Sequence, residues 1–215
     1  MRSRALLPML LMVPAIYAPA QVSISIGLPH LRIGLDVPVM PELVPVPGSP
    51  AFYAPSMDAN YFFYDGMYWV FRDDNWYASS WYNGPWSAVH PEAVPDFVLR
   101  IPVGFYRQPP AYFRGWQRES APHWGDHWGG DWNRRREGWD RWDRKAMPAP
   151  ARVPEYQRNF QGERYPGPDR QHELHQENYR YQPREPVVRD HYERQAEHGR
   201  NAPKEGRREE EHGHH

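Results

Sequence analysis

The chain contains no cysteine. It therefore forms no disulfide, carries no thiolate nucleophile and offers no cysteine for a lipid anchor. Small exported domains often compensate for a thin hydrophobic core with disulfides. This chain must instead depend on aromatic packing or on a partner, or remain partly unfolded.

The chain also has almost no net charge, since its formal charge is -1 over 215 residues. Charges of one sign are nevertheless segregated, with residues 51–99 acidic and residues 100–145 basic. A balance of this kind does not favour nucleic-acid binding, and we expect no nucleic-acid partner.

The apolar run near the N-terminus is short for a membrane span, which needs about 20 residues. Arg2 and Arg4 precede the run from Ala5 to Ala20, which contains prolines and ends in small residues. This arrangement predicts a cleaved signal peptide over residues 1–20 and a mature chain that begins at Gln21. We expect an exported protein of the periplasm or outer envelope, without an integral membrane segment after cleavage.

Residues 21–58 are predicted to form short strands followed by a linker. Apolar and polar residues alternate over 22–28 and again over 31–37, which is the period of a strand. Prolines recur from Pro38 to Pro50, and they exclude a helix and remove backbone donors over the stretch from Val37 to Ala54. We interpret that stretch as an extended linker.

The most ordered part of the chain is predicted to be residues 59–115, an aromatic domain with a proline-rich extension. Between residues 60 and 89, aromatic runs are separated by Asp65-Gly66, by residues 73–75 and by Asn83-Gly84, which is hairpin turn chemistry. We predict a four-strand meander and a mainly β fold, a small aromatic-rich antiparallel sheet.

The register of the first hairpin follows from its turn. A two-residue Asp65-Gly66 loop pairs Tyr64 with Met67, Phe63 with Tyr68, Phe62 with Trp69, and Tyr61 with Val70. Both faces of this hairpin are then aromatic, so both need cover. We expect that cover from the strands of residues 22–37 on one side and from residues 97–113 on the other.

The third turn carries the pattern W-x-x-G-x-W from Trp81 to Trp86. A two-residue Asn83-Gly84 loop would bring the two indoles together in a non-hydrogen-bonded pair, contributing about 0.5–1.5 kcal/mol beyond area burial. Pro85 has no amide hydrogen to close the tight turn, which leaves the register less firmly fixed.

Residues 61–86 resemble small exported proteobacterial proteins that carry a WxxGxW repeat, some of which are called BcpO-related. The resemblance rests on the Y-D-G-x-Y-W-V hairpin and the W-x-x-G-x-W turn, with the motif residues Asp65, Gly66, Trp69, Trp81, Asn83, Gly84 and Trp86. It implies an envelope location and a non-enzymatic accessory role, and it supplies no catalytic residues. Unlike the lipoprotein members, this chain has no cysteine after its signal.

Residues 116–145 form a segment rich in tryptophan, arginine and glycine. We predict a helix from about Asp131 to Lys145, with Asp131 as the N-cap, because three glycines weaken helix before it. The last five tryptophans of the segment lie close to one helical stripe: Trp124, Trp128, Trp132, Trp139 and Trp142. Together with Trp116 they are candidates for binding glycan, peptidoglycan or an anionic surface.

Residues 146–215 have few aliphatic side chains and many polar ones. Such a composition buries too little apolar area to offset the ordering cost, so we expect a disordered polyampholyte tail that contains histidines. Marginal helical stretches are predicted near His172 to Tyr181 and Asp190 to Arg200.

His123 and His127 are the residues that most resemble metal ligands, since they stand four apart with Asp126 between them. The alternative is that they are polar spacers between tryptophans. Histidines of the tail could also hold nickel, copper or zinc loosely. We find no nucleophile elbow and expect no catalytic residue and no cofactor.

Three functions remain open from the sequence. The first is a non-enzymatic cell-envelope protein with a structural or interaction role, whose partner is an envelope protein or glycan. The second is an envelope binding module that uses the tryptophans and arginines of residues 116–145. The third is a periplasmic metal-handling protein that uses His123, His127 and the histidines of the tail.

Overall fold

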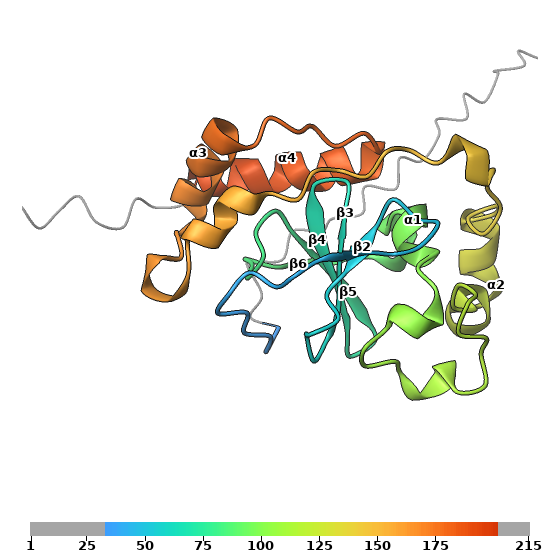
Figure 1. Ribbon diagram of the computed structural model, residues 1–215. Helices are drawn as coiled ribbons and strands as arrows, with labels where there is room; N and C mark the ends of the chain where they lie inside the picture. The colour runs from blue at the N-terminus through green and yellow to red at the C-terminus, as the bar shows by residue number, and fades with distance from the viewer. Residues whose placement is uncertain (1–32, 202–215) are drawn as a thin grey trace, which may run out of the picture.

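The computed structural model describes residues 33–201. The predicted signal peptide and the first predicted strand lie outside the described residues. The second predicted strand, over residues 31–37, is wrong where it can be examined, because residues 33–37 form no strand. The described part of the chain places a sheet at the centre, with helices around it and residues 146–201 folded back across it (Figure 1).

The sheet has six antiparallel strands in the order β1-β2-β3-β4-β5-β6, so each strand pairs with its neighbours in sequence. Their bounds are β1 Val44–Pro45, β2 Phe52–Tyr53, β3 Asn60–Tyr64, β4 Met67–Arg72, β5 Asn75–Ser79 and β6 Ser87–Val89. The four-strand meander predicted for residues 60–89 is confirmed as β3 to β6. The predicted linker is partly wrong, because β1 and β2 lie within it and extend the sheet at one edge.

The register predicted for the first hairpin is confirmed at all four pairs, from Tyr64 opposite Met67 to Tyr61 opposite Val70. The turn residues Asp65 and Gly66 have φ angles of 48° and 88°, and Asp73 and Asp74 in the next hairpin have 48° and 62°. Positive φ at both central positions defines the turn whose twist matches that of antiparallel strands. Local turn chemistry therefore sets this register.

Side chains alternate between the two faces of the sheet, and both faces are buried. On one face, Phe62, Trp69 and Trp76 belong to a cluster that includes residues 94–113 and Trp124. On the other face, Tyr61 and Phe63 pack with a second cluster, which is covered by residues 33–43 and by residues 151–181. The prediction that residues 97–113 cover one face is confirmed. The other face was expected to be covered by residues 22–37, but its cover comes mainly from residues 38–43 and 151–181.

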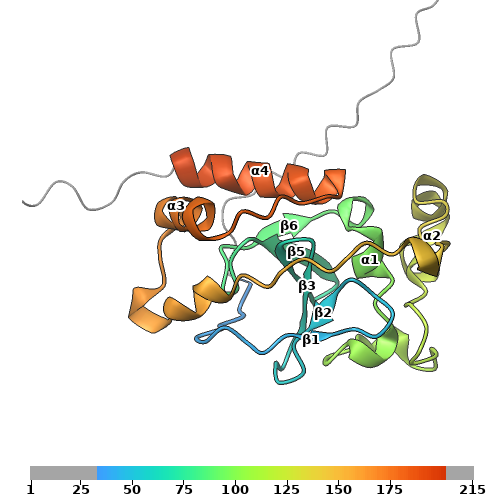
Figure 2. The ribbon, with the colours of Figure 1, turned by 45° about the horizontal axis from the view of Figure 1, so that its top comes forward.

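Within residues 33–201, four α-helices surround the sheet: α1 Asp96–Leu99, α2 Trp124–Arg135, α3 Pro168–Asn178 and α4 Pro186–Asn201. Short 3-10 helices connect them: Pro91–Ala93, Val103–Phe105, Ala111–Phe113, Arg144–Ala146, Glu155–Asn159 and Gly162–Arg164. Both views show α3 and α4 side by side, with α1 and α2 beyond one end of the sheet (Figures 1 and 2). A mainly β fold is thus only partly right, because helices hold more residues than strands around a sheet of the predicted kind.

The predicted pairing of the two indoles of the W-x-x-G-x-W turn is wrong. Strand pairing stops at Ala78 opposite Ser87, and residues 80–86 form an open loop with a turn closed by Gly84 N donating to Trp81 O at 3.1 Å. The ring of Trp81 contacts Tyr156, Phe160 and Tyr165, while the ring of Trp86 contacts Tyr61.

Gly84 is nevertheless required at its place in this motif. Its φ is +85°, and a Cβ there would lie 2.8 Å from Cδ1 of Trp86. A side chain at this position would therefore meet the indole of Trp86 as well as a strained backbone. In this motif Trp86 packs against the sheet, whereas Trp81 packs against the C-terminal segment.

The predicted helix from Asp131 to Lys145 is displaced in the structure. α2 begins at Trp124 and ends at Arg135, and Gly129, with φ of 83°, interrupts its helical geometry. Trp124 is fully buried, and its indole nitrogen donates to Leu99 O at 3.0 Å. Packing of this ring stabilises the first part of α2 although that part contains Gly125, whereas Gly129 breaks the helix as its low propensity predicts. Asp131 lies within α2, after this break, rather than at its N-cap.

The prediction of disorder beyond residue 146 does not hold up to Asn201, whereas residues 202–215 lie outside the described residues. α3 overlaps the first stretch predicted to be marginally helical but begins earlier, at Pro168, and ends before Tyr181, at Asn178. α4 contains the second predicted stretch and extends it at both ends. Gln157 is fully buried, donates to Ser80 O at 2.9 Å and accepts from the Tyr68 hydroxyl at 3.1 Å. Polar side chains thus attach this segment to the sheet and to the open loop.

Asp65 links the first hairpin to α4. Its carboxylate accepts the backbone N–H groups of Arg184 at 2.9 Å and of Glu185 at 2.9 Å, and also the hydroxyl of Tyr181. These amides lie just before the first residue of α4, where no helical carbonyl is available to them. A carboxylate from a distant turn therefore caps this helix.

Replacing Asp65 with asparagine should lower the free energy of unfolding by about 1–3 kcal/mol, because the carboxylate accepts stronger hydrogen bonds than an amide oxygen does. Urea denaturation followed by tryptophan fluorescence measures the change. Asp73→Asn is the matched control, since Asp73 has the same φ of 48° in the next turn and is exposed. Equal losses in the two variants would contradict the link to α4.

Candidate functional site

A cavity of about 190 Å³ lies at the start of α4. Its walls come from four parts of the chain: the end of β3 with the hairpin turn, α1, residues 148–151 and residues 181–186. The lining residues are Tyr64, Asp65, Phe97, Pro148, Ala149, Ala151, Tyr181, Arg184, Glu185 and Pro186. We call it the Glu185 cavity.

Glu185 gives this cavity its chemical character. Its Oε2 is buried and has no hydrogen-bond partner among the described residues. Burial raises the pKa of this carboxyl to about 7, with Asp96 and Asp65 adding to the shift, while Arg136 and Arg100 oppose it. The group therefore exchanges its proton near neutral pH.

Asp65 lies in the same wall but is fully engaged, because it accepts the backbone amides of residues 184 and 185 and the Tyr181 hydroxyl. The two acids consequently differ in availability. Glu185 retains unused hydrogen-bonding capacity, whereas Asp65 is a structural cap.

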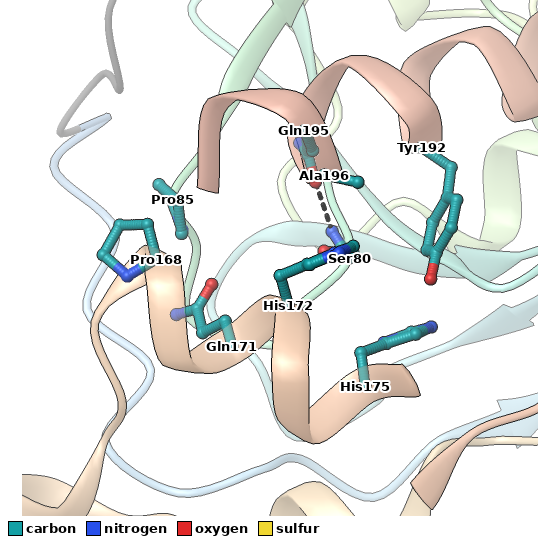
Figure 3. A pocket seen from close by; sticks show the side chains of 9 residues that line it. All are labelled: Ser80, Pro85, Pro168, Gln171, His172, His175, Tyr192, Gln195 and Ala196. Carbon is teal, nitrogen blue, oxygen red and sulfur yellow. Dashed lines mark hydrogen bonds between the residues drawn. The ribbon is translucent and has the colours of Figure 1, made fainter. Parts of the chain in front are cut away.

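A second, much smaller cavity of about 20 Å³ lies between α3, α4 and the loop after β5. Figure 3 shows His172 and His175 projecting from α3, opposite Tyr192 and Gln195 of α4. The side-chain amide of Gln195 accepts from Ser80 N at 2.8 Å, which closes one side. A space of this size holds about one water molecule, so it is no site for a substrate.

The buried histidines are neutral at physiological pH. Burial lowers the pKa of His175 to about 4, with His172 adding to the effect, and burial lowers the pKa of His191 to about 4 as well. His175 bonds the hydroxyl of Tyr156 through Nδ1 at 3.1 Å, and its Nε2 is buried without a partner among the described residues. These rings pack the two helices against the sheet.

The tryptophans predicted as a binding stripe are largely inside the protein. Trp124, Trp132 and Trp139 are 0%, 3% and 9% exposed, and Trp116, Trp128 and Trp142 are half-buried. Trp81 and Trp86 are buried too, and Trp69 lies in the core. Within the described residues, the exposed row of rings that stacking on a glycan requires is not present.

His123 and His127 have other partners than a metal. His123 pairs with Asp126 at 3.3 Å and stacks on the ring of Trp116, while His127 bonds Asp74 at 2.8 Å and stacks on Tyr112. Within residues 33–201, no group of three or more metal-ligating side chains is brought together. His212, His214 and His215 lie outside the described residues.

Among the predicted site residues, only Asp65 of the hairpin motif lines the Glu185 cavity; Asn83, Gly84 and the tryptophans lie elsewhere. Sequence reasoning missed Glu185 and Tyr181 because they lie in the segment expected to be disordered. A signal was present, since Pro186 follows Glu185 and precedes Val187-Val188, a short apolar pair in an otherwise polar stretch. Val188 is fully buried in the core.

Comparison of the chain with protein-family models, with curated proteins and with solved structures finds no match. Among the described residues, each helix is too short or too polar to cross a membrane.

The stability of the protein should depend on Glu185 in a defined direction. Folding raises the pKa of this carboxyl from 4.5 to about 7. The contribution of Glu185 to the free energy of unfolding is therefore fully present below pH 4.5, where the carboxyl is neutral, and it is lost as the pH rises through 7. The free energy of unfolding of Glu185→Gln, taken relative to that of the wild type, should therefore rise by about 2 kcal/mol when the pH is raised from 5 to 8.

Urea denaturation at the two pH values measures this difference. His175 and His191 contribute oppositely, losing stabilisation as pH falls from 6.5 toward 4, but they titrate in both proteins and cancel in the comparison. Glu193→Gln, an exposed change on the same helix, should show no pH-dependent difference. A difference for Glu185→Gln that is the same at pH 5 and pH 8 would contradict the assignment.

Proposed function

We propose that this chain is a non-enzymatic, exported protein of the cell envelope that acts by binding another envelope component. The observation that carries the interaction role is the Glu185 cavity, where an unpartnered carboxyl lies among the rings of Tyr64, Phe97 and Tyr181. Proteins bind small groups in concave sites that are mostly apolar and contain a few polar atoms.

A binding role is favoured over a catalytic one by the state of the neighbouring acid. General acid–base chemistry on a substrate commonly needs a second group that is free to act in the same cavity. Asp65 is held by two backbone amides and a hydroxyl, and Arg184 donates to Ala149 O at 3.0 Å. Among the described lining residues, Glu185 is the acid left to meet a ligand.

Export is proposed from the sequence. The basic start, apolar run and small residues over residues 1–20 support it, as does the resemblance of residues 61–86 to WxxGxW-repeat proteins of the envelope.

The first test is fractionation of bacteria that express the full chain. We expect a processed protein that begins at Gln21 in the periplasmic or outer-envelope fraction, identified by N-terminal sequencing. An unprocessed chain in the cytoplasmic fraction would contradict export.

The second test is quantitative cross-linking capture from envelopes with three baits: the wild type, Glu185→Gln and Glu193→Gln. A component retained by the wild type and Glu193→Gln but reduced at least fivefold with Glu185→Gln would support binding through the cavity. Capture that is equal for all three baits would contradict it.

A further inference from the structure

The charged groups that act on the Glu185 carboxyl are Asp65, Asp96, Arg100 and Arg136, and each of them already has other partners. On the hairpin turn, Asp65 caps α4. On α1, Asp96 accepts from Arg100 at 3.1 Å and also from Arg136. The acids beside Glu185 are thus neutralised or capped, while Glu185 is not.

The nearby guanidinium groups are directed elsewhere. Arg136 donates to Val94 O at 2.9 Å, and Arg100 donates to the backbone at Trp139 and Arg141. Neither arginine lines the cavity. Arg184 does line it, but its guanidinium donates to Ala149 O and lies 5.8 Å from the ring centre of Tyr181. No cation of the described chain bonds Oε2 of Glu185.

The aromatic part of the wall suits a cation. Aromatic faces attract ammonium and guanidinium groups, and the effect grows when water is excluded. Two of these rings already attract cations of the chain itself, because the guanidinium of Arg100 lies over Phe97, 5.2 Å from its ring centre, and that of Arg184 lies over Tyr181. The pocket is partly open to solvent, and its volume of about 190 Å³ leaves room for a small group with a short alkyl chain.

We propose that the Glu185 cavity binds a primary alkylammonium group, with the Glu185 carboxylate as its counter-ion and the rings of Tyr64, Phe97 and Tyr181 as its walls. An ammonium brings N–H donors, which an unpartnered carboxyl lacks, and a short alkyl chain fills the apolar part of the space. The proposal rests on the proposed function in that it names the ligand class of the same cavity.

Binding of an alkylammonium should depend on pH through the Glu185 carboxyl. Glu185 must be ionised to act as the counter-ion, and burial raises its pKa to about 7. Affinity for an alkylammonium should consequently rise about tenfold from pH 6 to pH 8, because the ionised fraction of the carboxyl rises by that factor.

The test uses n-butylammonium as the probe and n-butanol as its uncharged counterpart of similar size, titrated into the mature protein by NMR at pH 6 and pH 8. We expect butylammonium to bind at least tenfold more tightly than butanol at pH 8, and this preference to shrink at pH 6. Glu185→Gln should abolish the preference, Phe97→Leu should weaken butylammonium binding at least threefold, and Glu193→Gln should change neither.

Equal binding of the two probes, or butylammonium affinity that does not change with pH in the wild type, would overturn the proposal. These wild-type arms decide even if Glu185→Gln fails to fold. If butylammonium does not bind but envelope capture still depends on Glu185, the ligand class is wrong and the proposed function stands. If butylammonium binds while the chain stays unprocessed in the cytoplasm, the proposed function falls and the ligand class stands.

Discussion

The arrangement of this protein depends on one carboxylate that joins two distant parts of the chain. Asp65 is placed by the tight turn between β3 and β4, where its φ of 48° is one of two positive values that the turn requires. From there it accepts the backbone amides of Arg184 and Glu185, which directly precede α4 and lie more than a hundred residues later in the sequence. A local turn thus fixes where a long-range helix begins, and the start of that helix forms one wall of the Glu185 cavity.

The remaining attachment of the C-terminal segment uses the same chemistry on a second turn. Residues 80–86 form an open loop whose backbone groups would otherwise lack partners. Tyr165 donates to Gly84 O at 2.6 Å, and Gln171 donates to the same carbonyl at 3.1 Å. With Gln157 on Ser80 O, these polar side chains explain how a segment of low hydrophobicity can fold against an aromatic sheet (Figure 2).

The aromatic meander could be predicted from the sequence, whereas the fold of the polar C-terminal segment could not. The meander and the register of its first hairpin could be predicted, because Asp65-Gly66 and the flanking aromatic residues define them within a few positions of each other. The fold of residues 146–201 could not, since glutamine and tyrosine bonds to a distant loop leave no periodic pattern. Composition alone suggested disorder there.

The predictions for the site residues failed for the same reason, because the contacts of these side chains depend on distant parts of the chain. Trp81 and Trp86 looked like a cross-strand pair because their spacing fits a two-residue loop, but Trp81 instead packs against Tyr156, Phe160 and Tyr165. Trp124 and Trp132 looked like a surface stripe because helical spacing does not reveal which face is buried. Asp65 was recognised as a turn residue, but its second role requires knowledge of where α4 lies.

Amide hydrogen exchange of Arg184 and Glu185, followed by NMR in the native protein at neutral pH, tests the central claim most directly. These two N–H groups are bonded only if the C-terminal segment is docked on the hairpin turn through Asp65. Both amides should exchange at least a hundredfold more slowly than in an unfolded chain. Exchange at the unfolded rate would mean that the segment is not docked, and that the Glu185 cavity does not exist as described.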